Sequence, residues 1–577
     1  MEIHKGYNDR RRYSAVTRAE YIHNLSPILK GLEMRASVSL NYVGYYYNVY
    51  NTKPYKYNIK DYNFETGKHQ LLAISPDGSS RTLDFDVGGS SQTSQLSYEL
   101  RGLHVAAWGE HQTSLTVVFS GQETTASEVS SILNGIPQRN LGLAMRGSYG
   151  FKDKYFLEAS FGYNGSERFA EKHRFGFFPA VGGAWIASKE PFLANNTAHW
   201  LSYLKFRLSW GQVGNDGIIS NPRFVHLPVV STVSVAHPGT ATSATVERAI
   251  INSYPNDKIT WEIAEQVNLG VETKFFNGIV ELNADIYQEI RHNIIDKRYT
   301  MPETTGLEEL QIGNVGKTRS RGFDLSGKIQ HAFSPDFWMI LNGTFTYNKA
   351  IYLEQATNTP EWQRKKGKEI SQQIGYIAEG LFRGQAEIDN SPSQGGTGMT
   401  MPGDIRYRDL NGDGKIDVND AAYIGYPTTP RVIYGFSGSF QYKNVEFNFA
   451  FQGSGKRAFF MDPMQIGPFV NNRSMLKAIY DDHWSEDNMK ERPFWPRLST
   501  QAINMHNPQE GEYSNPGNPR FSTYFMRKCS FLRCTAIEVG YNLPKNVLDK
   551  LKMKNVKFYA RVNNPFLITN FKVWMWS

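Results

Sequence analysis

Two neighbouring runs of alternating residues decide the fold of this chain: Val432-Ile-Tyr-Gly-Phe-Ser-Gly-Ser-Phe-Gln441 and Val445-Glu-Phe-Asn-Phe-Ala-Phe-Gln452. Alternation is nearly strict, so each run predicts a β-strand with one large apolar face and one small or polar face. The short polar segment Tyr442-Lys-Asn444 predicts a hairpin turn between them. Such strands suit a soluble sandwich, or a membrane barrel whose apolar face meets lipid and whose polar face meets a wet lumen.

A second hairpin favours the barrel. It is predicted around Asn277-Gly278, because Asn-Gly is the strongest short hairpin signal. Its predicted inward residues include carboxylates: Asn268, Gly270, Glu272, Glu281, Asn283 and Asp285, between the apolar Val267, Leu269, Val271, Val280, Leu282, Ala284 and Ile286. A carboxylate at every second position is costly in a dry core but not beside water. This asymmetry is the main physical argument for a water-filled barrel.

The composition agrees with this fold class. Hydrophobic residues make up only 40% and mean hydropathy is −0.48, which excludes a transmembrane helix of about 20 apolar residues. The 32 Tyr and 35 Phe fit the aromatic girdles of a barrel. Residues 1–30 are polar with weak periodicity, and from about Gly31 the pattern predicts roughly twelve to fifteen strands, each near the ~9–11 residues that a tilted membrane strand needs.

We therefore predict an all-β, transmembrane antiparallel barrel region over residues 1–577, without a linker between domains. Long extracellular loops are expected near residues 51–95, 355–430 and 463–519, because barrels of this type carry long loops at one end. A short helix is expected around residues 361–374.

A stretch rich in oxygen ligands, Asp409-Leu-Asn-Gly-Asp-Gly-Lys-Ile-Asp-Val-Asn-Asp420, predicts a Ca²⁺ loop. Oxygen side chains stand at loop positions 1, 3, 5, 9 and 12 and glycine at position 6, as in an EF-hand loop. The expected ligands are Asp409, Asn411, Asp413, Asp417, Asp420 and the backbone carbonyl of Lys415. Asp420 replaces the usual bidentate Glu, which shortens its reach. The alternative is a solvated turn cluster without metal.

The sequence argues against two other classes. The net charge of +8 is spread along the chain without basic clusters and interleaved aromatics, so no nucleic-acid partner is expected. It has no His-Glu-x-x-His, no Gly-x-Ser-x-Gly and no Cys/His metal spacing, so we expect no enzyme, no catalytic residue and no cofactor-binding residue. Asp481-Asp482-His483 is interpreted as a solvated surface cluster.

Short motifs in a fixed order resemble the TonB-dependent outer-membrane transporters of the SusC/RagA type. They are Gly165-Ser-Glu-Arg-Phe169, Gly176-Phe-Phe-Pro179, Leu204-Lys-Phe-Arg-Leu-Ser-Trp-Gly211, Gly214-Asn-Asp216, Trp261-Glu262, Asn268-Leu-Gly270, Gly313-Asn-Val-Gly316, Arg321-Gly-Phe323, Gly403-Asp404, Phe531-Leu-Arg533, Gly540-Tyr-Asn-Leu-Pro544 and Asn563-Asn-Pro-Phe566. The resemblance covers residues from about 160 to 570.

The resemblance implies a barrel of about 22 strands with a plugged lumen. It also implies import of oligosaccharides or peptides across the outer membrane of a Gram-negative, Bacteroidota-like cell. The implied partners are outer-membrane lipid, a SusD-like surface lipoprotein and, through an amino-terminal part, TonB-ExbB-ExbD.

The chain departs from the family pattern at both ends. The plug, the TonB-contacting segment and the first barrel strands are missing, no signal peptide begins the chain, and the family continues beyond Val573-Trp-Met-Trp-Ser577. We therefore expect a fragment that does not transport by itself. The alternative function is a soluble or surface β-rich carbohydrate-binding protein, in which Trp and Tyr would stack on sugars.

Overall fold

The computed structural model describes residues 6–53, 57–73, 80–127, 132–197, 200–217, 224, 226–235, 246–307, 309–355, 357, 359–394, 400–468, 474–498 and 521–571. The chain forms two compact units. One comprises residues 1–151, 158–179 and 216–261, and the other comprises residues 152–157, 180–215 and 262–577.

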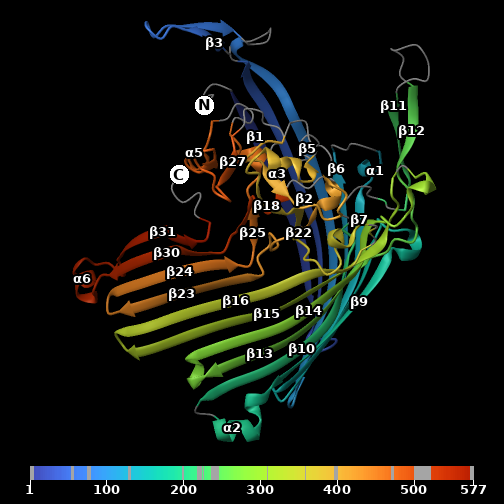
Figure 1. Cartoon of the computed structure of the whole chain (residues 1–577). Coiled ribbons are helices and arrows are strands. Elements are labelled where there is room, and N and C mark those ends of the chain that lie inside the picture. Colours follow the sequence, from blue (N-terminus) through green and yellow to red (C-terminus); the bar gives the residue numbers. More distant parts are fainter. Residues whose placement is uncertain are drawn as a thin grey trace. The chain divides into compact units, whose positions relative to one another are not determined.

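Long strands dominate both units (Figure 1). Hydrogen bonding links sixteen of them in one order: β1 (Gly6–Asn24), β2 (Leu32–Lys53), β5 (Ser80–Trp108), β6 (His111–Ala126), β7 (Gln138–Phe151), β8 (Tyr155–Ser166), β9 (Phe175–Ile186), β10 (Leu201–Asn215), β13 (Glu262–Phe275), β14 (Val280–Lys297), β15 (Ile312–Ser334), β16 (Phe337–Glu354), β23 (Val432–Tyr442), β24 (Val445–Gly455), β30 (Phe531–Asn542) and β31 (Lys557–Thr569). The prediction of an all-β antiparallel fold is confirmed.

Shorter elements connect the long strands. The short strands are β3 (Tyr57–Tyr62), β4 (His69–Ala73), β11 (Val229–Val235), β12 (Val246–Ser253), β17 (Gln373–Tyr376), β18 (Ala378–Leu381), β19 (Ser393–Gln394), β20 (Ile405–Tyr407), β21 (Lys415–Ile416), β22 (Ala422–Ile424), β25 (Ala458–Phe460), β26 (His483–Trp484), β27 (Trp495–Arg497), β28 (Phe521–Ser522) and β29 (Met526–Lys528). The helices are α1 (Ile132–Gly135), α2 (Pro191–Thr197), α3 (Gln385–Asp389), α4 (Pro463–Ile466), α5 (Lys477–Asp481) and α6 (Lys545–Lys550). None of the helices in the described ranges has the length and apolar character needed to cross a membrane.

Both predicted hairpins are confirmed. Phe436 pairs with Phe451 across β23 and β24, and Leu269 pairs with Ile286 across β13 and β14. In the second turn Asn277 and Gly278 have φ of 56° and 86°, the left-handed conformation that makes Asn-Gly favourable there. The apolar residues of β13 and β14 therefore share one face, which we call the outward face, and the carboxylates share the other, the inward face.

Three expectations are corrected. Residues 51–95 are not one loop, because β3 and β4 form a hairpin and β5 begins at Ser80. The Gly/Ser-rich part of β5 was predicted to be a loop because of its composition. Gly88 is instead a strand residue that lies directly against the ring of Tyr47 on β2, where a side chain would clash. Residues 361–374 contain only a single turn of 3₁₀ helix, at Glu361–Gln363, before β17 begins.

The third correction concerns the strand count. Roughly twelve to fifteen strands were predicted, and sixteen occur in the large sheet alone among the described residues. The largest omission is β1, which pairs with β2 from Gly6 to Asn24 through backbone hydrogen bonds despite a weakly periodic sequence. Its side chains are almost all exposed, so burial imposes no strict apolar alternation on it.

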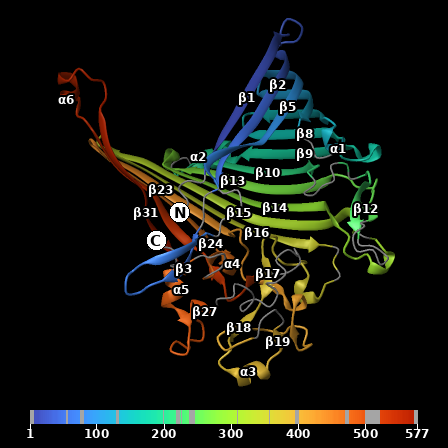
Figure 2. The same ribbon diagram turned by 90° about the horizontal axis from the view of Figure 1, so that it is seen from above.

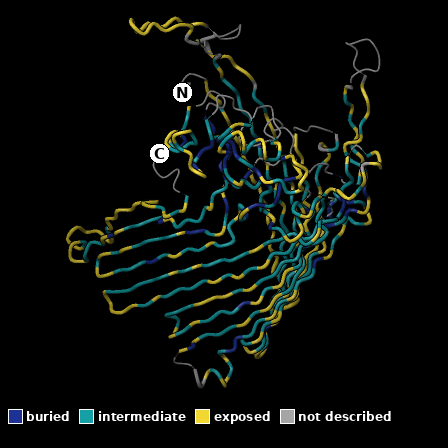
Figure 3. Tube along the Cα trace, viewed as in Figure 1, coloured by how far each residue is buried: buried dark blue, intermediate teal, exposed yellow. Residues whose placement is uncertain are grey.

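Described residues of the loops predicted at 355–430 and 463–519, together with neighbouring residues such as Tyr524, build a compact core. Tyr376, Ile405, Ile479, Trp495 and Tyr524 are each at most 2% exposed and belong to one cluster, which we call the loop core. Figure 2 shows β17, β18 and β19 gathered near α3. In Figure 3 the long strands of this unit alternate mainly between intermediate and exposed residues. The most deeply buried packing of this unit therefore lies in its loops.

Candidate functional site

The predicted Ca²⁺ loop forms a tight turn around Asp409. Its carboxylate accepts backbone N–H groups from Gly412 at 2.7 Å and Gly414 at 2.9 Å. These two glycines have φ of 75° and 80°, a conformation that a side chain would strain. The N–H of Gly414, with that of Gly412, holds the pKa of Asp409 below its usual range. The glycine at loop position 6 therefore bends the chain around Asp409, as the spacing predicts.

The remaining predicted ligands form two groups. Asn411 and Asp413 lie next to each other, and the Asn411 side-chain nitrogen donates to Asp413 at 3.0 Å. Asp420 is instead fully buried, and its two oxygens accept the N–H groups of Leu410 and Asp417, each at 2.8 Å. Asp420 therefore closes the loop through backbone contacts. Lys415 begins β21, which pairs in parallel with β19.

No group of three or more His, Cys, Asp or Glu side chains in the described ranges is arranged to hold a metal ion. A cation at this loop would therefore need the Asn411 amide oxygen and the Lys415 carbonyl beside the carboxylates. Oδ1 of Asp420 already accepts two backbone N–H groups, from Leu410 at 2.8 Å and from Asn411 at 3.4 Å, and Oδ2 accepts that of Asp417. The donors are hard oxygens, the kind that Ca²⁺ prefers.

A buried ion pair, which the sequence analysis does not predict, joins two parts of the loop core that lie 93 residues apart. Arg497 donates from Nε to Asp404 at 2.7 Å, and the Asp404 side chain is only 2% exposed. The backbone supports the pair, because Arg497 N–H donates to the carbonyl of Gly403. Gly403 has φ of 88° and lies against the ring of Trp484, so the Gly403-Asp404 motif is required for packing as well as charge.

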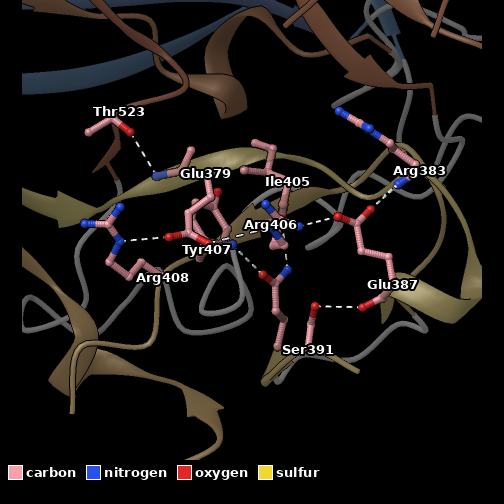
Figure 4. A network of polar contacts seen from close by, with 11 residues as sticks. Glu379, Arg383, Glu387, Ser391, Ile405, Arg406, Tyr407, Arg408 and Thr523 are labelled. Carbon is pink, nitrogen blue, oxygen red and sulfur yellow. Dashed lines mark hydrogen bonds and ion pairs between the residues drawn. The ribbon is translucent and has the colours of Figure 1, made fainter. Parts of the chain in front are cut away.

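Partly exposed charged side chains form a network on the same loops (Figure 4). Arg408 donates to Glu379 at 2.8 Å, Arg406 pairs with Glu387, and the Arg383 N–H donates to Glu387 at 2.7 Å. These contacts tie α3 to β18 and β20. Because the groups are half-exposed, each pair contributes little stability. We regard this network as support for the loops and not as a binding site.

The inward face of the strands carries paired charges. Arg207 on β10 contacts Asp285 on β14 at 2.7 Å and Glu272 on β13 at 3.0 Å. It reaches β14 by passing over Gly270, where a Cβ would lie 2.7 Å from both Arg207 and Asp285. Glycine at this position thus permits an ion pair that skips a strand. As predicted, Glu272 and Asp285 lie on the same face of the strands, and both pair there with Arg207.

In the other unit, the inward face is hollowed by small polar side chains. Ser39 on β2, Ser97 on β5, Gln122 on β6 and Asn140 on β7 occupy successive paired positions across the strands. They line a cavity of about 430 Å³, which we call the polar cavity. At Gly142 a Cβ would lie 2.7 Å from Asn164, so this glycine keeps the cavity open.

Four of the motifs quoted above meet beside this cavity. Ser166 at the end of β8 donates to Asp216, which directly follows β10, at 2.6 Å, so the starts of two connecting segments are tied together. The rings of Phe169 and Phe178 pack on Trp261, with centroids 5.4 and 5.3 Å apart. Ser166 and Phe169 are at most 1% exposed. These motif residues therefore hold the connecting segments in place.

The chain matches known proteins over most of its length. A family model described as "TonB dependent receptor-like, beta-barrel" matches residues 3–464. A TonB-dependent receptor of Formosa agariphila is 28% identical over 443 residues, covering 74% of this chain and 41% of that protein. The TonB-dependent receptor SusC of Bacteroides thetaiotaomicron is 25% identical over 438 residues, covering 74% of this chain and 40% of SusC.

Solved structures agree at the level of the fold. The structure of the RagAB peptide transporter superposes with a TM-score of 0.65 at 17% identity, covering 97% of this chain and 59% of that chain. The chain thus spans about two fifths of the sequence relatives and about three fifths of this structure. The predicted resemblance and the predicted barrel fold are confirmed.

Proposed function

Because the chain belongs to the family of TonB-dependent receptor-like β-barrels, we propose that it serves nutrient import across the outer membrane of a Bacteroidota-like cell. In this proposal the strands form the barrel wall, and oligosaccharides or peptides pass along the inward face. In the same proposal TonB-ExbB-ExbD supplies the energy and a SusD-like surface lipoprotein delivers the substrate. The similar proteins named "TonB-dependent receptor SusC" and "RagAB peptide transporter" support a TonB-dependent import function.

The polar cavity is the observation that carries this proposal. Ser, Asn and Gln side chains both donate and accept hydrogen bonds, so they can exchange water for the hydroxyl or amide groups of a passing solute. The cavity volume of about 430 Å³ falls in the usual range for ligand sites, roughly 300–1,000 Å³. The exposed apolar outward face favours this function over that of a soluble carbohydrate-binding protein, because such a face would need a protein core in water.

A complementation experiment tests the proposal. Cells that lack the gene are offered fluorescent oligosaccharides and fluorescent peptides, and uptake is measured with and without a proton uncoupler. The intact gene should restore uncoupler-sensitive uptake of one class. Gly142→Leu fills the polar cavity and should reduce this uptake about tenfold. Gly147→Leu is the matched control, because no atom lies within 4 Å of its added Cβ. Uptake that does not depend on the gene would refute the proposal.

We also propose that Ca²⁺ binds the Asp409–Asp420 loop and braces it. The turn of Gly412 and Gly414 around Asp409 and the contact between Asn411 and Asp413 support this proposal, because they gather oxygen-bearing side chains within a few residues. Titration calorimetry on the whole chain should give a Ca²⁺ signal that Asp413→Ala with Asp417→Ala abolishes. Asp549→Ala, an exposed aspartate elsewhere, should leave it unchanged. No heat from the intact chain would exclude the site.

A further inference from the structure

The outward face of the second unit contains an apolar groove of about 480 Å³. It crosses β9 between the segment Tyr155–Leu157 and β10. Val181, Phe206 and Leu208 form its walls together with Leu157, and all are outward side chains of the sheet. The groove therefore lies on the surface that, in a protein of this family, faces the hydrocarbon of the membrane.

The groove exists because its floor lacks side chains. Gly183 pairs with Leu208, and the neighbouring pair Trp185 and Phe206 closes one end. A Cβ built on Gly183 would meet only the Phe156 carbonyl oxygen, at an ordinary contact distance of 3.7 Å. Gly183 has no positive φ, so neither packing nor backbone strain requires glycine here. The hollow is thus a feature that a larger side chain could fill without distorting the sheet.

Polar groups cluster at the Trp185 end of the groove. Glu190 accepts hydrogen bonds from the Tyr155 hydroxyl at 2.6 Å, the Trp185 indole N–H at 3.3 Å and the Lys154 ammonium at 3.3 Å. Lys189, which is exposed, directly precedes Glu190. Tyr and Trp with one apolar side and one polar tip mark the boundary between hydrocarbon and headgroups.

We propose that this groove binds one phospholipid, with an acyl chain over Gly183 and the headgroup phosphate beside Lys154 and Lys189. The turn at residues 152–154 is short, and short turns of such barrels lie on the periplasmic side, where the leaflet consists of phospholipid. An acyl chain needs no hydrogen bonds, and the strands around Gly183 already pair their backbone groups with one another. This inference goes beyond the proposed import function and does not depend on it.

Native mass spectrometry of the detergent-purified chain tests the proposal. With added phosphatidylethanolamine, the unmodified chain should retain one lipid that withstands collisional activation. Gly183→Leu should lose it. Gly343→Leu is the matched control, because Gly343 is an outward glycine of the same unit with open space at its Cβ and lies outside the groove. Equal retention by Gly183→Leu and the unmodified chain would overturn the proposal.

A second measurement on the unmodified chain keeps the proposal testable if Gly183→Leu does not fold. Phosphatidylethanolamine with a photoreactive acyl chain is incorporated into vesicles with the chain, and labelled peptides are mapped. Label should concentrate on Leu157, Val181 and Leu208. Label spread equally onto outward residues of β14, such as Leu282 and Ile286, would overturn the proposal. So would a dimer that Gly183→Leu dissociates, because the groove would then seat a second copy.

Discussion

Strands β13–β16 and the loop core belong to the same unit, but their apolar side chains differ in exposure to solvent. On the strands, Leu269 and Ile286 are 49% and 65% exposed, while Tyr376 and Trp495 of the loop core are 0% and 2% exposed. The loop core is packed like a soluble protein, whereas the outward face of the strands has no protein covering it. The same residue types thus serve two different surroundings.

This difference shows that the placement of charged groups indicates whether apolar side chains pack in a protein core or lie on a strand whose opposite face meets water. In the loop core a buried charge has close partners: Asp404 pairs with Arg497, and Asp420 accepts backbone N–H groups. On the strands, charges recur along the inward face and pair with half-exposed partners, as for Arg207 and Asp285. The inward face is therefore a wet surface, and mutations should have different effects in the two regions.

The largest effect is expected in the loop core. Trp495→Ala removes a fully buried indole that packs on Phe525, so it should lower the free energy of unfolding of the loops by about 3–5 kcal/mol. Proteolysis of residues 355–525 in increasing urea measures this change. The exposed Tyr480 of the same loops is the control, and Tyr480→Ala should change the value by less than about 0.5 kcal/mol.

The next effect separates the two faces of a strand. Leu282→Arg on the outward face should cost about 2–4 kcal/mol near the middle of the bilayer, because the charge must leave water. Asn283→Arg on the inward face should cost far less. A folding titration in lipid vesicles measures both variants. Equal penalties at the two positions would show that both faces meet the same solvent.

The buried carboxylate of the loop core should make its stability depend on pH. Burial raises the pKa of Asp404 to about 6, although bonds from Met401 N–H and Arg497 oppose the shift. The folded core then binds more protons than the unfolded chain between pH ~4 and ~6. The unfolding free energy of the loop core should therefore fall by about 1–3 kcal/mol as the pH rises through this window. Asp404→Asn should abolish this dependence; a flat profile in the unmodified chain would contradict it.

The smallest effect concerns the inward ion pairs. A double-mutant cycle of Arg207→Ala and Asp285→Ala should give a coupling of about 0.5–1 kcal/mol, because both groups are partly exposed to water. High salt should weaken the coupling. Coupling above about 3 kcal/mol would mean that the inward face is dry, like the loop core.

The sequence predicts the strands well wherever one face is apolar. Alternation from Val267 to Ile286 and the turn at Asn277 give the correct hairpin and faces, because the period of a strand determines which side chains share a face. Prediction from alternation fails for β1, which lacks an apolar face, and for β5, whose glycines accommodate Tyr47 from another strand. Periodicity cannot report contacts that come from a neighbouring strand.

The site is predicted less well for the same reason. Local spacing correctly predicts that the chain turns around Asp409, because its hydrogen bonds span only a few residues. Asp404 and Arg497 are 93 residues apart, and only the folded loops bring them together. The polar cavity likewise combines residues from several strands. No local pattern contains that information.

The assignment of the inward face to water and the outward face to lipid is tested most directly on β14. Single cysteines are placed at Leu282, Asn283, Ala284, Asp285 and Ile286, in a chain with Cys529→Ala and Cys534→Ala, and are labelled in outer-membrane vesicles with a charged maleimide. We predict labelling at 283 and 285, and protection at 282, 284 and 286 that detergent with denaturant removes. Equal labelling on both faces would contradict the assignment of the outward face to lipid.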